Sequence, residues 1–237
     1  MEPREYGLMD AAEDGMWWYR ALHARLCDAL DGIEGRVLDA GCGTGGFLSA
    51  LHERHPELGR IGVEWAAMAA IRAGEKSGAA IARGSVNRLP FADRSFDAAV
   101  SADVLCHAAV EPGPALAELK RVLRPAGRLI LNLPAYRWML SAHDRQVHNV
   151  RRFTAGDVGA LLRQAGFQRV RAGYWNGLLL PLMIVQRKLL ARDDAVSDVA
   201  PFPPWLDVTL HGVTKLERIL PFALPAGGSV LAIAEKP

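Results

Sequence analysis

The sequence has little net charge, few cysteines and no long hydrophobic run, and each of these shortages excludes a class of protein. Its formal net charge is +2, which predicts neither a nucleic-acid-binding protein nor a strongly acidic one. Its three cysteines are widely spaced without a CxxC pair, which argues against a disulfide framework and a thiolate zinc site. The most apolar segment, residues 177–185, is much shorter than the roughly 20 residues of a membrane-spanning helix. We therefore expect no nucleic-acid partner, no metal site and no membrane span.

The composition is that of a globular protein with a sizeable core. Hydrophobic residues make up 50% of the 237-residue chain and charged residues 23%. This length fits one α/β domain with a small addition. Residues 1–20 carry several acidic side chains and lack the apolar segment of a signal peptide. Together with cysteines that are expected to stay reduced, these features predict a cytoplasmic protein.

Apolar segments that are typical of strands alternate with segments of helical periodicity. The strand-like segments are unbroken apolar runs, which indicate a parallel sheet that is buried on both faces. Because strands and helices alternate, the sequence predicts an α/β fold with a doubly wound, mostly parallel, seven-stranded Rossmann-like sheet. The expected strands are residues 36–40, 60–64, 79–84, 96–102, 127–133, 167–174 and 229–236. The expected helices are residues 13–30, 45–54, 66–77, 114–124, 155–165, 176–191 and 205–220.

A glycine-rich turn follows the first expected strand. Residues 37–47 read VLDAGCGTGGF, so Asp39 stands directly before the turn. Glycines let the backbone turn tightly and let a ligand approach the main chain, and open α/β sheets bind ligands at this end of their strands. The glycines also match the dinucleotide pattern GxGxxG, with Glu64 placed as a ribose-binding acid. The turn alone therefore leaves the identity of the cofactor open.

Three features favour one cofactor over a dinucleotide. The carboxylate of Asp39 suits a cationic ligand group better than a pyrophosphate. Residues 87–97 lead into the fourth strand, and this strand ends in SADVL at 101–105. With these features, the chain resembles class I S-adenosylmethionine-dependent methyltransferases of the bacterial small-molecule, type 11-like kind over about residues 35–175. The segments that carry the resemblance are VLDAGCGTGGF, IGVE, ARGSVNRLPFADRSFDAAVSADVLCH and LKRVLRPAGRLILNLP.

The resemblance implies S-adenosylmethionine as the cofactor and S-adenosylhomocysteine as its product. The backbone of Ala40, Gly41 and Gly43 would lie beside the methionine and ribose parts of the cofactor. Asp39 would contact or orient its amino-acid end, and Glu64 would accept hydrogen bonds from both ribose hydroxyls.

The resemblance also assigns residues to the adenine and to the methionine. Trp65 follows the ribose acid and would pack on adenine. Related enzymes often have an acid near the end of the third strand, whereas this chain has Ser85. Ser85 or the backbone of Val86 would therefore meet the adenine amine. Ser101, near the end of the fourth strand, would face the methionine moiety.

Residues 134–154 follow the fifth strand and form the expected acceptor side of the site. His143 and His148 have i, i+5 spacing, so they do not share one face of a helix, and no cluster of acids or thiols completes a metal site. We expect a histidine instead to act as general base where the acceptor must lose a proton. The candidates are His143, His148 and His107, the last of which follows the fourth strand.

Aromatic residues are expected to hold the acceptor. Trp17 and Tyr19 lie off the apolar stripe of the N-terminal helix, which makes them candidates for the pocket. Tyr136 and Trp138 accompany the histidines of the segment after the fifth strand. The sequence names neither the acceptor nor its nucleophile, which is oxygen, nitrogen or carbon.

The chain is expected to form a single methyltransferase domain, residues 1–237. Its parts are an N-terminal helical lid at 1–33, a cofactor-binding core at 34–175, a helical insertion at 176–221 and a closing strand at 228–237. The insertion caps an apolar acceptor pocket or forms a homodimer, and the sequence leaves both open. The preferred function is methylation of a small-molecule acceptor, with a place in bacterial secondary metabolism.

Two other functions compete with methyl transfer. An NAD(P)-dependent oxidoreductase on the same glycine turn predicts a catalytic YxxxK pattern, which the chain does not contain. A non-catalytic binding protein with the same fold predicts a degraded glycine turn or a missing ribose acid, and both features are intact.

Overall fold

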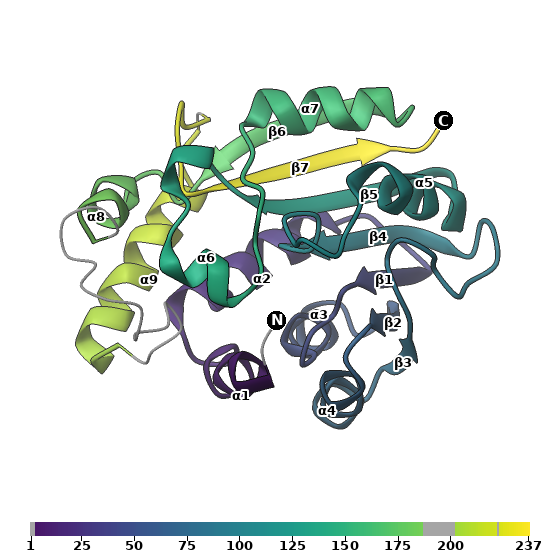
Figure 1. The fold of residues 1–237 in the computed structure, drawn as a ribbon, viewed down its shortest axis with the longest axis horizontal. Coiled ribbons are helices and arrows are strands. Elements are labelled where there is room, and N and C mark those ends of the chain that lie inside the picture. Colours follow the sequence, from purple (N-terminus) through teal and green to yellow (C-terminus); the bar gives the residue numbers. More distant parts are fainter. Residues whose placement is uncertain (1–2, 187–201, 222) are drawn as a thin grey trace.

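The computed structural model describes residues 3–186, 202–221 and 223–237 (Figure 1). Within these residues the strands are β1 (Arg36–Ala40), β2 (Gly59–Glu64), β3 (Ala80–Arg83), β4 (Phe96–Ala102), β5 (Leu123–Pro134), β6 (Gln168–Trp175) and β7 (Ser229–Glu235). They form one seven-stranded sheet in the order β3-β2-β1-β4-β5-β7-β6. The first five strands in this order, β3, β2, β1, β4 and β5, are parallel, and β7 is antiparallel to both of its neighbours. The predicted doubly wound, mostly parallel sheet is confirmed.

The order of the strands reverses between β1 and β4. The chain moves outward from β1 to β2 and β3, and then returns to β4 on the other side of β1. The connections after β1 and β4 therefore leave the sheet in opposite directions and open a crevice between them. This topology places the glycine turn and the end of β4 at one site.

Helices cover both faces of the sheet (Figure 1). They are α1 (Pro3–Ala12), α2 (Trp17–Ala29), α3 (Gly46–Arg54), α4 (Ala67–Ser77), α5 (Pro112–Val122), α6 (Ala142–Gln146), α7 (Ala155–Gln164), α8 (Leu180–Val185) and α9 (Pro204–Arg218), with a short 3₁₀ helix η1 (Arg137–Met139). None of the helices in the described ranges is long and apolar enough to cross a membrane.

The structure corrects the expected N-terminal helix. Residues 13–16 form a turn that includes Gly15, so α2 begins at Trp17 rather than at residue 13. A separate helix, α1, precedes this turn. The sequence pattern does not indicate α1, because its apolar residues form no regular stripe.

One further segment differs from expectation, and another gains detail. The helix expected at 176–191 is present as the shorter α8, and residues 187–191 lie outside the described residues. The segment after β5 was expected to form the acceptor wall, and it contains η1 and α6. Asn176, between β6 and α8, has a positive φ of 59°, so the chain changes direction there and the helix begins later than expected.

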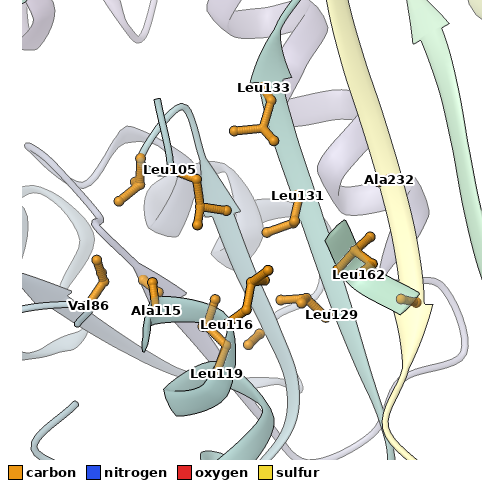
Figure 2. Close-up of a cluster of buried hydrophobic side chains, with 14 of the residues drawn as sticks. Val86, Leu105, Ala115, Leu116, Leu119, Leu129, Leu131, Leu133, Leu162 and Ala232 are labelled. Atoms are coloured by element: carbon orange, nitrogen blue, oxygen red, sulfur yellow. The ribbon is translucent and has the colours of Figure 1, made fainter. Parts of the chain in front are cut away.

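Alternate residues of β5 face two separate hydrophobic clusters. Leu129, Leu131 and Leu133 pack with leucines of α5 and α7, as Figure 2 shows. Ile130 points to the opposite face and packs in a cluster with α2 and α3. Because side chains alternate along a strand and both faces are covered, the strand is apolar throughout. These clusters hold the ends of β1 and β4 in place under the site.

Candidate active site

A cavity of about 910 Å³ lies at the carboxyl ends of β1, β2 and β4. Helices α1, α2, α6 and α8 contribute side chains to its walls. It has the size and position of a small-molecule site in a doubly wound sheet. The predicted residues that line it are Asp39, Gly41, Gly43, Glu64, Trp65, Ser85, Val86, Trp17, Tyr19, His107 and His148. One cavity therefore brings together residues predicted for the cofactor and residues predicted for the acceptor.

Ala40 and Ser101 do not line this cavity, and for Ser101 this corrects the prediction. Ser101 is 1% exposed, and its hydroxyl donates to the carbonyl of Ala40 at 2.9 Å. A hydroxyl inside a sheet needs a partner, so the side chain turns toward β1. The next two residues of the chain, Ala102 and Asp103, line the cavity instead.

The structure also corrects the expected acceptor wall. Tyr136 and Trp138 do not line the cavity; their rings stack on each other with centroids 5.7 Å apart. Tyr136 also stacks on Tyr174 of β6, at 5.3 Å. Aromatic stacking therefore draws this segment toward the antiparallel edge of the sheet. The backbone of His143 belongs to α6, and its side chain lies outside what the structure describes.

The glycine turn exposes its backbone to the cavity. Gly41 and Gly43 have φ values of 89° and 53°, which favour glycine. A Cβ at Gly41 would lie 2.4 Å from Val104 Cγ2, so no larger residue fits there. The amide of Gly41 donates to the carbonyl of Val63 in β2, which ties the turn to the neighbouring strand. The turn is therefore a fixed cradle in which a ligand contacts main chain.

Glu64 at the end of β2 is held beside this cradle. Its Oε2 accepts from the amide of Gly43 at 3.1 Å, and its Oε1 accepts from the amide of Ala66 at 2.9 Å. The hydroxyl of Tyr6 in α1 also donates to Oε1, at 3.1 Å. Burial, and next the Glu64 carboxylate, raise the pKa of Tyr6. Glu64 thus accepts a hydroxyl in the role that the resemblance assigns to ribose. This hydroxyl comes from α1, a helix that was not predicted.

Asp39 is a buried carboxylate without a counter-charge. It is 3% exposed, and among the described residues it has no hydrogen-bond partner. Burial, and next the carboxylates of Glu64 and Glu13, raise its pKa to about 8. Glu13 itself is neutralised, since it accepts from Lys76 Nζ at 2.7 Å and from Thr44 Oγ1 at 2.6 Å. A cationic ligand group bound beside Asp39 would favour the ionised carboxylate and would be stabilised by it.

Asp39→Asn is expected to change how stability depends on pH. The pKa of Asp39 in the folded protein is about 8, above its ordinary value of 3.8. The folded state thus holds a proton that the unfolded state releases, so the free energy of unfolding falls as pH rises from about 4 to about 8. The variant lacks this loss, and above about pH 8 it should be more stable than the wild type by more than about 1.4 kcal/mol.

Urea unfolding of the ligand-free protein from about pH 4 to about pH 9 measures this difference. Asp31→Asn is the matched control, because the Asp31 side chain is exposed. A stability difference between Asp39→Asn and wild type that stays constant over this range would contradict a buried, uncompensated carboxylate.

Asp103 is a second carboxylate in the cavity, directly after β4. The side-chain amide of Asn132 in β5 donates to both of its oxygens, at 3.1 and 3.2 Å. Trp175 Nε1 donates to Asn132 Oδ1 at 2.8 Å, which fixes the orientation of that amide. Burial raises the pKa of Asp103 to about 7. A carboxylate held in this way is poised to take up or release a proton near neutral pH.

The other ionisable groups nearby are less suited to accept a proton. Burial lowers the pKa of His107 to about 4, so its imidazole is neutral and a weak base. Asp144 of α6 is 1% exposed and accepts from Arg152 with both oxygens, two of the contacts being 2.9 Å. This buried pair holds α6 against the segment before α7. Asp103 is the acid of the SADVL segment, and its place at the end of β4 is the sequence signal for this role, which was not predicted.

The remaining wall of the cavity is apolar and aromatic. Helix α2 contributes Trp17, Trp18 and Leu22, and α8 contributes Met183. Trp18 also stacks on Trp175, at 6.1 Å, which links this wall to the hydrogen bonds that orient Asp103. The space beside the two carboxylates therefore suits an apolar molecule.

Residues 38–131 match the family model of the methyltransferase domain. The chain is 32% identical to an uncharacterized protein in transposon TN4556 of Streptomyces fradiae, over 82% of this chain and 59% of that protein. It is 38% identical to the demethylmenaquinone methyltransferase of Deinococcus radiodurans, over 48% of each chain. The chain thus spans between about half and three fifths of the length of these curated relatives.

Solved structures share the fold at low sequence identity. A SAM-dependent methyltransferase of Thermotoga maritima superposes with a TM-score of 0.63 at 21% identity, over 99% of this chain and 95% of that one. Geranyl diphosphate C-methyltransferase of Streptomyces coelicolor, solved with S-adenosyl-L-homocysteine, gives 0.61 at 16% identity, over 92% of this chain and 78% of that one.

Proposed function

We propose that this protein methylates a small-molecule acceptor. Residues 38–131 match the methyltransferase domain family, and the chain has the fold of class I S-adenosylmethionine-dependent methyltransferases. The observation that carries the proposal is the set of groups around the glycine turn. The turn exposes backbone at Gly41 and Gly43, Glu64 accepts a hydroxyl, and Asp39 is a buried carboxylate without a counter-charge. These groups fit a ligand with a ribose and positive charge, which S-adenosylmethionine has and a pyrophosphate lacks.

The same groups suggest how the cofactor would be held. Glu64 would accept the ribose hydroxyls in place of Tyr6, and Asp39 would stabilise the ammonium group of the amino-acid end. Trp65 is 72% exposed, so its ring is free to lie against adenine. Ser85 also lines the cavity and is the candidate partner of the adenine amine. When bound, the cofactor supplies an electrophilic methyl group.

The chain's own residues would prepare the acceptor. The apolar wall of α2 and α8 would hold its body and exclude water, which raises the effective concentration of the nucleophile. Asp103 would accept the proton that a hydroxyl, amine or acidic carbon loses. His107 and His148, which also line the cavity, remain candidates for this role.

An apolar acceptor also agrees with the names of the relatives. Demethylmenaquinone methyltransferase and the 24-methylenesterol C-methyltransferase 2 of Oryza sativa, 28% identical over 63% of this chain, are both named for hydrophobic ring compounds. Aromatic and aliphatic side chains of α2 and α8 line the cavity of this protein together with Asp103. We infer an acceptor with an apolar body and one group that carries a removable proton.

A screen with isotopically labelled cofactor tests the proposed reaction. The purified protein is incubated with S-adenosylmethionine that carries a labelled methyl group and with a panel of apolar phenols, quinols and amines. Mass spectrometry should find the label on at least one apolar compound. Label found only on strongly polar compounds would contradict the proposed acceptor class.

A further inference from the structure

Helix α9 carries an apolar face that is turned outward. Trp205, Val208 and Leu216 on the helix, and Ile219 directly after it, are 70%, 67%, 54% and 76% exposed. Their spacing places them on one side of the helix, with Gly212 between them. The opposite side, with Leu210 and Glu217, is buried against the body of the protein. An exposed apolar face of this extent marks an interaction surface.

The acidic residues of α9 are turned away from this face. Asp207 accepts from the amide of Trp17 at 2.7 Å and pairs with Arg20. Glu217 pairs with Arg25 at 3.1 Å and accepts from the amide of Gly177 at 2.7 Å. Both carboxylates are thereby neutralised inside the protein. The outward face therefore presents no negative charge.

A small basic groove lies beside the apolar face, between α2 and α9. Its volume is about 100 Å³. Its charged and titratable lining residues are Arg20, Arg25, His211, Lys215 and Arg218. The three arginines are paired, Arg218 with Asp28 of α2 and the other two with the acids of α9. Within the described ranges Lys215 forms no ion pair, so its charge is the one that the groove offers to an anionic group from outside.

Exposed apolar residues continue onto α8. Leu178, Leu182 and Val185 are 43%, 51% and 40% exposed. The amides of Gly177 and Leu178 donate to Glu217, so the segment that leads into α8 is fixed beside the last turn of α9. Both helices lie at the end of the molecule away from β2 and β3 (Figure 1). Met183 of α8 lines the main cavity, so this surface borders the site.

We propose that the outward face of α9, with the basic groove beside it, rests on the surface of an anionic phospholipid membrane. The apolar side chains would enter the boundary between headgroups and acyl chains, with Trp205 at the headgroup level. Lipid phosphates would meet Lys215 and the groove, where their charge is complementary. A second copy of the chain fits less well, because a symmetric pair of these faces would bring the two basic grooves together.

Vesicle flotation tests this proposal without an acceptor or a cofactor. The wild-type chain is mixed with vesicles of phosphatidylglycerol and phosphatidylcholine in equal amounts, and separately with phosphatidylcholine alone. We expect the protein to float with the anionic vesicles and to bind neutral ones at least about fivefold more weakly. Lys215→Glu should lower binding to the anionic vesicles by about fivefold or more.

Two further variants test the apolar contribution. The double variant Val208→Glu/Ile219→Glu should lower vesicle binding more than about tenfold. Ile71→Glu is the matched control, since Ile71 is 57% exposed on α4, which packs beside β3. This control should bind vesicles like the wild type. Unchanged thermal unfolding midpoints confirm that all variants fold.

Three results would overturn the proposal. They are no flotation at about 1 mM lipid, equal binding by the wild type and the double variant, and a stable dimer in light scattering that the double variant loses. The last result would assign the face to a second copy of the chain. None of them bears on cofactor binding, so failure here leaves the proposed methyl transfer to be judged separately.

Discussion

Replacing Glu64 with alanine is expected to weaken the binding of S-adenosylhomocysteine by about 10²-fold or more, because two hydrogen bonds to a charged group are worth about 1.5–3 kcal/mol each. Both oxygens of Glu64 already accept hydrogen bonds, from Gly43, Ala66 and Tyr6. The carboxylate is therefore oriented before any ligand arrives, and a ribose would use an acceptor whose position is already fixed. Calorimetric titration of both proteins measures the change in affinity.

Two controls separate lost contacts from lost structure. Glu64→Gln keeps one side-chain oxygen as acceptor for the amides of the turn, so its affinity should fall between wild type and alanine. Glu75→Ala removes an acid with a 62% exposed side chain on α4 and should leave the affinity unchanged. If Glu64→Ala binds S-adenosylhomocysteine as tightly as the wild type, the ribose lies elsewhere and the proposed cofactor site is wrong.

Replacing Asp103 with asparagine is expected to slow methyl transfer by about 10²-fold or more, the usual range for loss of a general base. Asparagine has the same size and tolerates the positive φ of 54° at this position, so the fold should persist. The pKa of Asp103 is about 7. The wild-type rate should therefore rise through about pH 7, where the carboxylate loses its proton, and the variant should lack this rise.

The rate is measured with whichever acceptor the labelled-cofactor screen finds. Asp93→Asn, with a 71% exposed side chain, is the control and should keep the wild-type rate and pH profile. Affinity for S-adenosylhomocysteine should be nearly unchanged in Asp103→Asn. A parallel loss of that affinity would place Asp103 at the cofactor instead. A normal rate in this variant, with a slow one in His107→Ala or His148→Ala, would move the base to a histidine.

The sequence predicted best the positions of residues that directly follow a strand of the parallel sheet. Parallel strands bring their carboxyl ends to one edge, so the turn after β1 and Glu64 at the end of β2 had to be neighbours once the sheet was predicted. The amide of Gly43 contacts Glu64 at 3.1 Å as a result. The fold follows from this geometry, as does the placement of most of the predicted cofactor residues in one cavity.

The acceptor side depended on side-chain packing, which the pattern of residues does not encode. Tyr136 and Trp138 found stacking partners at the sheet edge, and Ser101 found a carbonyl inside the sheet. Helix α1 has no apolar stripe, so nothing in the sequence indicated that Tyr6 would reach Glu64. Asp103 is oriented by the side-chain amide of Asn132, which is distant in sequence and adjacent only in the folded sheet.

The most direct measurement of the central claim is a calorimetric comparison of two ligands on the wild-type protein. Titration with S-adenosylhomocysteine should show binding near micromolar, about −8 kcal/mol, and titration with NAD⁺ at the same concentrations should show none. This result follows from a cavity that joins an acceptor for ribose hydroxyls at Glu64 to a buried carboxyl at Asp39, which a cationic ligand group would ionise. Binding of NAD⁺ with no heat from S-adenosylhomocysteine, even at about 1 mM, would contradict the account and favour a dinucleotide-dependent enzyme.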